Sequence, residues 1–344
     1  MDIEALTNRK EICPDDEKIS AYFKGKRILI TGGAGFIGSR LCRKIATYHP
    51  KSLVIADAWE NGIYEMRNLL SPLSCVKTYL ASVRDKKRLE EIFLEEKPQI
   101  VFHAAAHKHV PIMEENPEEA VKNNVLGTYH TALCADRFET EKFILISTDK
   151  AVNPVSVMGA TKRIGELLMQ AMNPLSYTAF SAVRFGNVLG SSGSVLPLFE
   201  GQIACGMPVT VTDKKVTRFF MSPKEAAGLV LSCCGFADGG IFVLDMGHPV
   251  RIYDLAQKLI AHSGKQIPIE LIGLRPGDKL SEELFYGDCL PTAIPHIFSE
   301  PAVSVNLEAL TKQIQQLFYA PKDTIRQELQ KIVPEYHVAQ RRAK

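Results

Sequence analysis

Short apolar runs recur along the first 250 residues of the chain, separated by longer stretches with helical spacing. Because these runs are continuous rather than alternating, they predict strands that helices cover on both faces. Strands that alternate with helices are typical of a doubly wound parallel sheet in an α/β fold. The predicted strands cover residues 27–31, 52–57, 100–106, 143–147, 181–185 and 241–246.

A glycine-rich turn follows the first predicted strand directly. Gly32, Gly35 and Gly38 have the spacing GxxGxxG, and Phe36 and Ile37 open the helical pattern that follows. In such a turn the first glycine permits the tight bend and the second lets the backbone approach a pyrophosphate. The third allows the helix to pack closely on the sheet. The turn therefore predicts a Rossmann-type dinucleotide site.

An acidic residue ends the next predicted strand. Asp57 lies twenty-five residues beyond Gly32, where a carboxylate can bind both hydroxyls of the adenosine ribose. It favours NAD, because a 2′-phosphate would bring like charges together. Arg40, in the first helix, is a candidate counter-cation for that phosphate, and it leaves NADP open as the alternative.

The pattern of elements loosens after residue 188, where segments rich in glycine, serine and proline begin. A second set of elements runs from residue 251 to the C-terminus. We predict a smaller C-terminal substrate-binding lobe beside the Rossmann domain. The predicted parts are an N-terminal extension (1–25), the NAD(P)-binding domain (26–188 and 232–248) and the lobe (189–231 and 249–344).

Charge and cysteine usage narrow the class of protein. Forty-one basic and thirty-nine acidic residues give a net charge of +2, which predicts neither nucleic acid nor an anionic membrane as partner. The eight cysteines form no CxxC pair, so we expect reduced thiols and no metal site. Neither a signal peptide nor an apolar run of about eighteen residues is present, which predicts a cytoplasmic protein without membrane spans.

Beyond the glycine turn, residues 24–285 resemble the extended short-chain dehydrogenases/reductases. Residues 81–85 stand where that family usually has Gly-Asp-Val-Arg-Asp around the adenine, so Ser82 replaces the aspartate and Val83 follows it. The stretch after the fourth predicted strand, with Ala104 and Ala105, resembles the family's cofactor-lining segment. Residues 124–128 resemble its structural helix motif.

Three longer stretches, residues 103–111, 147–154 and 158–163, resemble the polysaccharide-biosynthesis dehydratases that act on UDP-N-acetylglucosamine. The larger members of that group carry N-terminal membrane spans, and this chain resembles only their soluble catalytic part. The resemblance implies a 4,6-dehydratase acting on UDP-N-acetylglucosamine or a related UDP-sugar. Such an enzyme takes a hydride from C4, eliminates water across C5 and C6 and returns the hydride to C6, which gives a UDP-4-keto-6-deoxy sugar. The resemblance also implies a homo-oligomer, since members commonly pair through two helices of each subunit.

The family's usual Tyr-x-x-x-Lys pattern is altered. Met158 occupies the position of the tyrosine, and methionine cannot accept or donate a proton, so ordinary tyrosine-based oxidation is excluded. Lys162 can still orient the nicotinamide ribose, and its charge makes the pocket electropositive. Methionine in place of tyrosine resembles the members that retain the C5 configuration more than those that invert it.

Thr148, Asp149 and Lys150 supply acid and base groups at the end of a predicted strand, where such sheets place their reactive crevice. The resemblance implies that Asp149 protonates the departing C6 hydroxyl and that Lys150 removes the C5 proton. We expect a depressed pKa for Lys150, since burial and the nearby charge of Lys162 disfavour its ammonium form. Lys162, Thr148 and a water on Asp149 remain alternatives for deprotonating the C4 hydroxyl.

The resemblance also assigns substrate contacts beyond residue 184. Residues 184–188 and 190–195 resemble the stretch that meets the sugar and the diphosphate, and residues 210–212 resemble the segment that passes the uracil. Residues 275–279 resemble the segment that clamps the nucleotide. The implied substrate-binding residues are Lys108, Asn187, Ser194, Val195, Thr210, Thr212, Arg218, Arg275 and Asp278.

Two other functions remain open on the sequence. A nucleotide-sugar 4-epimerase would share the cofactor and the C4 oxidation, but it needs no elimination across C5 and C6, so Asp149, Lys150 and Met158 count against it. A non-catalytic NAD(P)-binding sensor could have kept the fold after losing the tyrosine. The intact Thr148-Asp149-Lys150 sequence counts against that reading.

Overall fold

The computed structural model describes residue 4, residues 10–191 and residues 193–337. Within these residues, a central nine-stranded sheet has the order β14-β15-β11-β6-β5-β4-β1-β2-β3. Its strands are β1 (Arg27–Thr31), β2 (Ser52–Asp57), β3 (Val76–Leu80), β4 (Ile100–His103), β5 (Lys142–Ile146), β6 (Ala179–Arg184), β11 (Ile241–Leu244), β14 (Leu290–Pro291) and β15 (Ile297–Ser299). The run from β3 to β11 is parallel, whereas β15 is antiparallel to β11 and β14. The predicted Rossmann-type doubly wound sheet is confirmed, with an unpredicted antiparallel edge.

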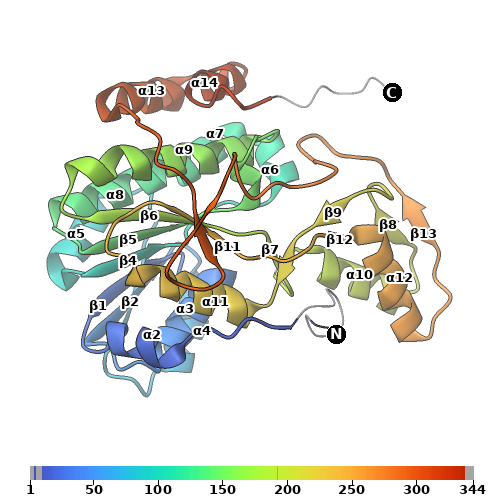
Figure 1. Cartoon of the computed structure of the whole chain (residues 1–344), viewed down its shortest axis with the longest axis horizontal. Helices are drawn as coiled ribbons and strands as arrows, with labels where there is room; N and C mark the ends of the chain where they lie inside the picture. Colours follow the sequence, from blue (N-terminus) through green and yellow to red (C-terminus); the bar gives the residue numbers. More distant parts are fainter. Residues whose placement is uncertain (1–3, 5–9, 192, 338–344) are drawn as a thin grey trace.

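Helices cover both faces of this sheet (Figure 1). One face carries α2 (Asp16–Phe23), α3 (Phe36–Ala46), α4 (Glu60–Leu70) and α11 (Pro223–Ser232). The other carries α5 (Lys86–Glu96), α6 (Val110–Glu115), α7 (Pro117–Ala120), the π-helical turn η1 (Val121–Leu126), α8 (Gly127–Arg137) and α9 (Val157–Met172). The last two helices, α13 (Leu307–Tyr319) and α14 (Ile325–Ile332), pack over α9 and η1.

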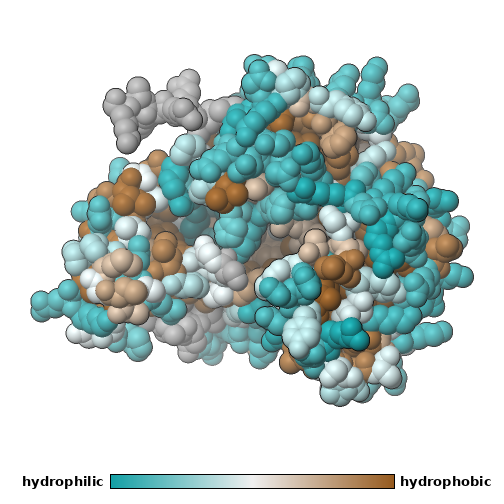
Figure 2. Space-filling view, turned by 180° about the vertical axis from the view of Figure 1, so that it is seen from behind, coloured by the Kyte–Doolittle hydropathy of each residue, from teal (hydrophilic) through white to brown (hydrophobic). Residues whose placement is uncertain are grey.

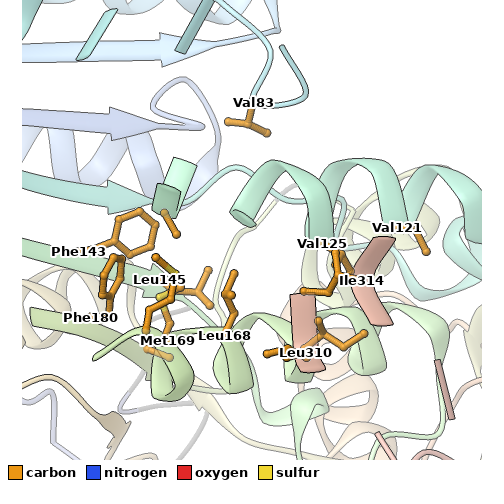
Figure 3. Close-up of a cluster of buried hydrophobic side chains, with 14 of the residues drawn as sticks. Val83, Val121, Val125, Phe143, Leu145, Leu168, Met169, Phe180, Leu310 and Ile314 are labelled. Atoms are coloured by element: carbon orange, nitrogen blue, oxygen red, sulfur yellow. The ribbon is translucent and has the colours of Figure 1, made fainter. Parts of the chain in front are cut away.

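Each face has its own buried apolar cluster. On the α9 side, Phe143 and Leu145 of β5 lie near Leu168 and Met169 of α9, and Ile314 of α13 belongs to the same cluster (Figure 3). Burying a large aliphatic or aromatic side chain contributes about 1.5–3 kcal/mol relative to leaving it exposed. The C-terminal helices are therefore part of the main hydrophobic core.

A smaller lobe lies beyond the carboxyl ends of the strands. Its elements are α10 (Val195–Ala204), β8 (Val209–Val211), β9 (Thr217–Arg218), β12 (Val250–Arg251), α12 (Ile252–Ser263) and β13 (Ile269–Leu271). The pair β7 (Asn187–Val188) and β10 (Phe220–Met221) connects it to the main sheet. Its separate core includes Phe199, Val209 and Leu255.

The lobe is shorter than we predicted. α11 packs on α3, and its buried residues join the core of the main domain, although residues 223–231 were assigned to the lobe. Likewise β15 extends the main sheet, and α13 and α14 cover α9. The predicted N-terminal extension also differs, because Phe23 of α2 is fully buried in the main core; residues 1–3 and 5–9 lie outside the described residues.

The surface is mixed in character. On the face shown in Figure 2, hydrophilic residues predominate and hydrophobic residues gather only in small groups. Among the described helices, none has both the length and the apolar character that crossing a bilayer requires.

Candidate active site

A cavity of about 770 Å³ lies where the carboxyl ends of β1, β4 and β5 face the smaller lobe. Its wall includes, from the predicted site residues, Gly32, Gly35, Phe36, Ile37, Gly38, Ala104, Lys108, Thr148, Lys150, Met158, Lys162, Asn187 and Ser194. The predicted residues outside this wall are Arg40, Asp57, Ser82, Val83, Ala105, Asp149, Val195, Thr210, Thr212, Arg218, Arg275 and Asp278. Parallel sheets bind their ligands at this end of the strands.

The glycine turn is too tight for side chains at two positions. A Cβ on Gly32, whose φ is +69°, would lie 2.4 Å from the Ala105 nitrogen. A Cβ on Gly38 would lie 2.1 Å from the Gly32 carbonyl oxygen. The turn thus packs against the backbone of 104–105 and leads into the N-terminus of α3, whose free N–H groups favour an anion.

Asp57 organises the same region from the end of β2. Its Oδ2 accepts a hydrogen bond from the Ala34 N–H at 3.0 Å, and its Oδ1 accepts one from the Trp59 N–H at 3.0 Å. The Arg40 guanidinium stacks on the Phe36 ring, with its carbon 3.5 Å from the ring centroid. Arg40 Nη1 also donates to the Phe36 carbonyl, so this arginine is held on its own helix.

The two residues of the predicted adenine segment differ in exposure. Val83 is buried and packs on Gly127, where a Cβ would come within 2.5 Å of Val83 Cγ2. Ser82 is half-buried, and its Oγ accepts a hydrogen bond from the Arg84 N–H. Val83 therefore packs inside the protein, whereas Ser82 keeps a partly exposed polar side chain.

A short 3₁₀ turn, η2 (Asp149–Ala151), follows β5 and carries the acid and base groups. The Asp149 side chain is fully buried, and its Oδ1 accepts hydrogen bonds from the Thr148 hydroxyl at 2.9 Å and from Lys150 Nζ at 2.8 Å. Its Oδ2 has no hydrogen-bond partner among the described residues. A buried carboxylate oxygen without a partner is costly, and Asp149 lies directly behind the cavity wall, between Thr148 and Lys150, which line it.

The pKa of Lys150 differs from our expectation. Burial alone would lower the pKa of its amine, but the Asp149 and Glu282 carboxylates outweigh burial and raise that pKa. The expected depressed pKa is therefore wrong. The lysine rests as an ammonium ion between two carboxylates, because its nearest ionic partners are anions rather than Lys162.

Helix α9 brings Met158 and Lys162 to the same cavity, one helical turn apart. Gly159 permits this approach, because a Cβ there would lie 2.2 Å from the Lys150 carbonyl oxygen. Lys162 is buried, and its Nζ donates to the Ile146 carbonyl at 2.5 Å. Burial lowers the pKa of Lys162 to about 8, against the opposing effect of Glu166.

Several residues predicted to bind substrate have partners within the protein. The Thr210 hydroxyl accepts from Gln202 Nε2 at 2.8 Å, and Arg275 Nε donates to Asp278 Oδ2 at 3.1 Å. Arg218 Nη2 donates to the Lys279 carbonyl at 2.9 Å. Thr212 is half-buried beyond β8, and Val195 opens α10.

Asn187, Ser194 and Lys108 line the cavity itself. Ser194 stands at the N-cap of α10, and its buried hydroxyl has no hydrogen-bond partner within residues 10–191 and 193–337. Burial lowers the pKa of Lys108. Of the stretch 190–195, Ser192 lies outside the described residues, and Arg184 of the stretch 184–188 is buried away from the cavity wall.

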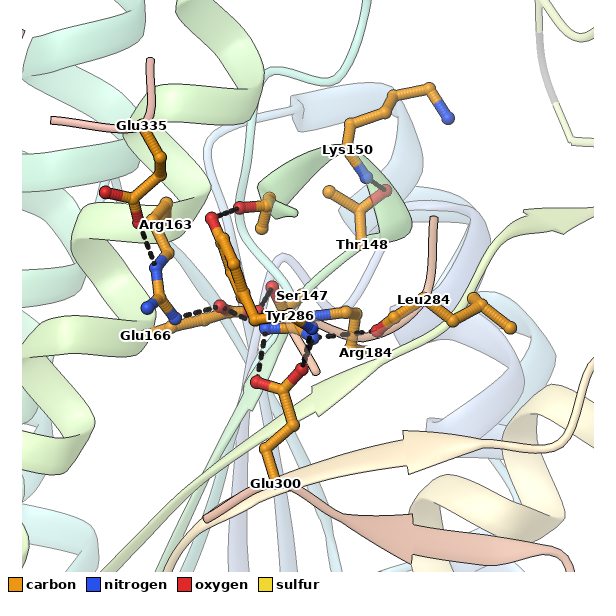
Figure 4. A network of polar contacts seen from close by, with 11 residues as sticks. Ser147, Thr148, Lys150, Arg163, Glu166, Arg184, Leu284, Tyr286, Glu300 and Glu335 are labelled. Carbon is orange, nitrogen blue, oxygen red and sulfur yellow. Dashed lines mark hydrogen bonds and ion pairs between the residues drawn. The ribbon is translucent and has the colours of Figure 1, made fainter. Parts of the chain in front are cut away.

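A buried ionic network behind the cavity was not predicted (Figure 4). Arg184 Nη2 lies 2.7 Å from Glu166 Oε2, and Arg184 Nη1 lies 2.5 Å from Glu300 Oε1. Glu166 also accepts from the Ser147 hydroxyl at 2.7 Å, directly before the acid–base turn. The only local signal in the sequence was Glu166 one turn after Lys162, which spacing alone does not distinguish from a surface glutamate.

Comparison with known proteins supports this fold and shows the family of the chain. The model of a family described as polysaccharide biosynthesis protein matches residues 28–299. The probable polysaccharide biosynthesis protein EpsC of Bacillus subtilis is 45% identical over 95% of this chain and 56% of its own length, so the chain spans little more than half of that relative. The X-ray structure of Pen from Bacillus thuringiensis is 32% identical, with a TM-score of 0.77 over 86% of this chain and 99% of that one.

Two further relatives carry reaction names. A UDP-N-acetylglucosamine 4,6-dehydratase (inverting) of Campylobacter jejuni is 36% identical over 77% of this chain and 79% of its own. A UDP-glucose 4-epimerase of Rickettsia canadensis is also 36% identical, over 76% and 78%. Fold and site thus define an extended short-chain dehydrogenase/reductase, related to nucleotide-sugar dehydratases and epimerases. Within that class, the chain belongs to the polysaccharide biosynthesis protein family.

Proposed function

We propose that the chain is a UDP-N-acetylglucosamine 4,6-dehydratase that forms a UDP-4-keto-6-deoxy-N-acetylhexosamine. The observation that carries the proposal is the hydrogen bond between the buried Asp149 and the half-buried Lys150, which lines the same cavity as Met158. A 4-epimerase requires no acid and base for elimination, whereas a dehydratase requires both near C5 and C6. The relative named as a 4,6-dehydratase supports this reaction, and the equally identical relative named as an epimerase makes epimerisation the second candidate.

The residues of the glycine turn fit a nicotinamide dinucleotide. The backbone at Gly32 and Gly38 leaves no room for a Cβ, and α3 presents its N-terminus for the pyrophosphate. Asp57 would bind the adenosine ribose and favours NAD over NADP, with Ser82, Val83, Ala104 and Ala105 along the cofactor. A bound nicotinamide would supply reversible acceptance of a hydride. Lys162 would orient its ribose.

The Asp149–Lys150 hydrogen bond already holds the proton that elimination needs. If the Nζ proton moves across this 2.8 Å bond to Oδ1, Lys150 becomes a neutral base and Asp149 a carboxylic acid. Lys150 then removes the C5 proton, and Asp149 protonates the C6 hydroxyl, which leaves as water. For the C4 hydroxyl, Thr148, Lys162 and a water on Asp149 remain the candidates. The pKa of Lys162, about 8, favours Lys162 as the acceptor of that proton.

The lobe would bind the UDP part of the substrate. Asn187, Ser194 and Lys108 line the cavity and carry groups suited to phosphate oxygens, and α10 begins at Val195 with its N-terminus at the same wall. Arg218, Arg275, Asp278, Thr210 and Thr212 would complete the nucleotide site after they exchange their present partners for the ligand. A homo-oligomer and a cytoplasmic location stay predictions.

The test is proton NMR of UDP-N-acetylglucosamine incubated with the protein in deuterated water. A new C6 methyl signal with deuterium at C5 supports the dehydratase, and the ring couplings give the C5 configuration. A UDP-N-acetylgalactosamine spectrum without a methyl signal would establish the epimerase instead. An unchanged sugar spectrum with bound cofactor would favour the non-catalytic sensor.

A matched pair of variants separates the chemistry from binding. Asp149→Asn keeps the side-chain volume but removes the acid, so we expect turnover to fall at least 100-fold while the UDP-sugar still binds. Glu308→Gln, on the exposed first turn of α13, serves as the control and should turn over normally. Full activity of Asp149→Asn would contradict the assignment of the acid.

A further inference from the structure

Glu282 carries a buried carboxylate with no role in the proposed reaction so far. Its side chain is only 3% exposed, and its Oε1 lies 3.6 Å from Lys150 Nζ and 3.7 Å from Arg218 Nε. Its Oε2 is buried, and no group in the described part of the chain forms a hydrogen bond with it. Burying a carboxylate costs free energy unless cations compensate its charge. The two cations here, Lys150 and Arg218, come from different parts of the molecule.

The segment around Glu282 is fixed to the acid–base turn. We call residues 279–286 the strap. Lys279 Nζ donates to the Val152 carbonyl at 2.8 Å, and the Tyr286 hydroxyl donates to the Ala151 carbonyl at 2.7 Å. The strap therefore holds both of its ends against the residues that follow Lys150, and Figure 4 shows Tyr286 in the network behind that turn.

The strap is also attached to the lobe and to β6. Arg218 of β9 donates through Nη2 to the Lys279 carbonyl, and Arg184 of β6 donates through Nη1 to the Leu284 carbonyl at 2.8 Å. Glu282 lies between these two attachments. Its backbone position is thus set by the lobe on one side and by the sheet on the other.

Four ionic groups then follow one another in alternating sign: Asp149, Lys150, Glu282 and Arg218. Asp149 meets Lys150 at 2.8 Å, while the two Glu282 pairs are longer, at 3.6 and 3.7 Å. The series is electrically neutral, which offsets the cost of burying each member. The two carboxylates together raise the pKa of Lys150.

We propose that Glu282 is a positioning residue for Lys150, holding its amine beside Asp149 and joining it through Arg218 to the lobe that would receive the UDP-sugar. The inference rests on the proposed function only in naming Lys150 as the base. Glu282 itself touches neither cofactor nor substrate in this role. It acts through the location and charge of the lysine.

The first experiment needs no turnover. Lysines are labelled with ¹³C at Cε, the Lys150 signal is assigned by its loss in Lys150→Arg, and its NMR titration is compared in wild type, Glu282→Gln and Glu282→Asp. Removing one carboxylate should lower the midpoint for Lys150 by on the order of one pH unit. Glu282→Asp, which keeps the charge, should recover most of the shift, and the exposed control Glu270→Gln should show none.

The second experiment follows the reaction. If the wild type incorporates deuterium at C5, Glu282→Gln should lower kcat about tenfold or more with a smaller change in KM. The pH at which exchange reaches half its maximum should also move to lower values. A loss of kcat with an unmoved pH profile and an unmoved Lys150 midpoint would mean that Glu282 only supports the fold, and would overturn the proposal. Absence of turnover in wild type would reject the dehydratase alone, because the titration still decides the role of Glu282.

Discussion

Lys162 is a buried amine, and its titration makes stability depend on pH. Its pKa is about 8 in the folded protein, against 10.5 for an ordinary lysine. Between these values the unfolded chain binds more protons than the native protein, so the free energy of unfolding rises with pH. Relative to Lys162→Met, the wild type should gain about 2 kcal/mol between pH 7 and pH 10.

Urea unfolding of both proteins at the two pH values measures this difference. The exposed Lys312→Met serves as the control and should follow the wild type at both pH values. Parallel stability curves for wild type and Lys162→Met would show that Lys162 titrates normally.

Gly38 cannot accept a side chain, since its Cβ would meet the Gly32 carbonyl oxygen at 2.1 Å. Gly38→Ala should therefore displace the turn, lower stability by about 1–3 kcal/mol and weaken NAD binding, measured by calorimetry. Gly201→Ala in α10 is the matched change, because outside its own helix no atom of the described residues lies within 4 Å of the added Cβ. This control should be neutral or stabilise by up to about 1 kcal/mol. Unchanged NAD affinity in Gly38→Ala would count against the dinucleotide site.

At the scale of residues, the sequence predicted groups whose role depends on local geometry. The turn glycines, Met158 and Lys162 all reach one cavity, because a strand, a turn and a helical spacing fix their places. Glu282 and Glu300 were not predicted. Their ionic partners lie more than sixty residues away along the chain, so no spacing in the sequence indicates the pairing.

At the scale of elements, buried ion pairs connect β6 with α9 and with Glu300, the residue that directly follows β15. Arg184 is fully buried between Glu166 and Glu300. Arg184→Met would leave both carboxylates without their main partner, so we expect a loss of about 3–5 kcal/mol in the free energy of unfolding. The control is Arg251→Met, whose ion pair with Asp254 is exposed and should contribute less than about 1 kcal/mol. Equal melting temperatures for the two variants would contradict a structural role for the network.

The sequence predicted the strands best where helices cover both faces of the sheet. The central strands β1 and β2 have the predicted bounds, and the runs at 100–106 and 241–246 continue past β4 and β11 into loops. β3 was missed because this edge strand has no continuous apolar run, and none of its residues is buried. β14 and β15 were missed because two- and three-residue strands carry no periodicity.

For the whole molecule, the C-terminal helices belong to the main cooperative core. Ile314 of α13 is fully buried in the same cluster as Phe143 and Leu168. Ile314→Ala should lower the free energy of unfolding by about 2–5 kcal/mol in one transition with the Rossmann domain. Leu94→Ala, at a side chain 62% exposed, should have little effect. A separate early transition in Ile314→Ala would show that the helices fold independently.

The packing of α13 and α14 limits which helices could pair in the predicted homo-oligomer. All residues of α9 except Leu167 and Gln170 are buried within the single chain, because α13 and α14 cover the side that the sheet does not. Any pairing of subunits would therefore use helices other than α9, or the outer surface of α13 and α14. Sedimentation of the full chain distinguishes a monomer from a dimer.

β15, α13 and α14 pack on the main domain, and this packing affects how the chain folds during its synthesis. The sheet that carries the glycine turn gains its antiparallel edge only after residue 299, and the core cluster on the α9 side includes residues up to Tyr336. A growing chain shorter than this exposes the apolar face of α9 on the ribosome, and contacts so distant in sequence form slowly. The protein should thus depend on chaperones until residue 336 has left the ribosome.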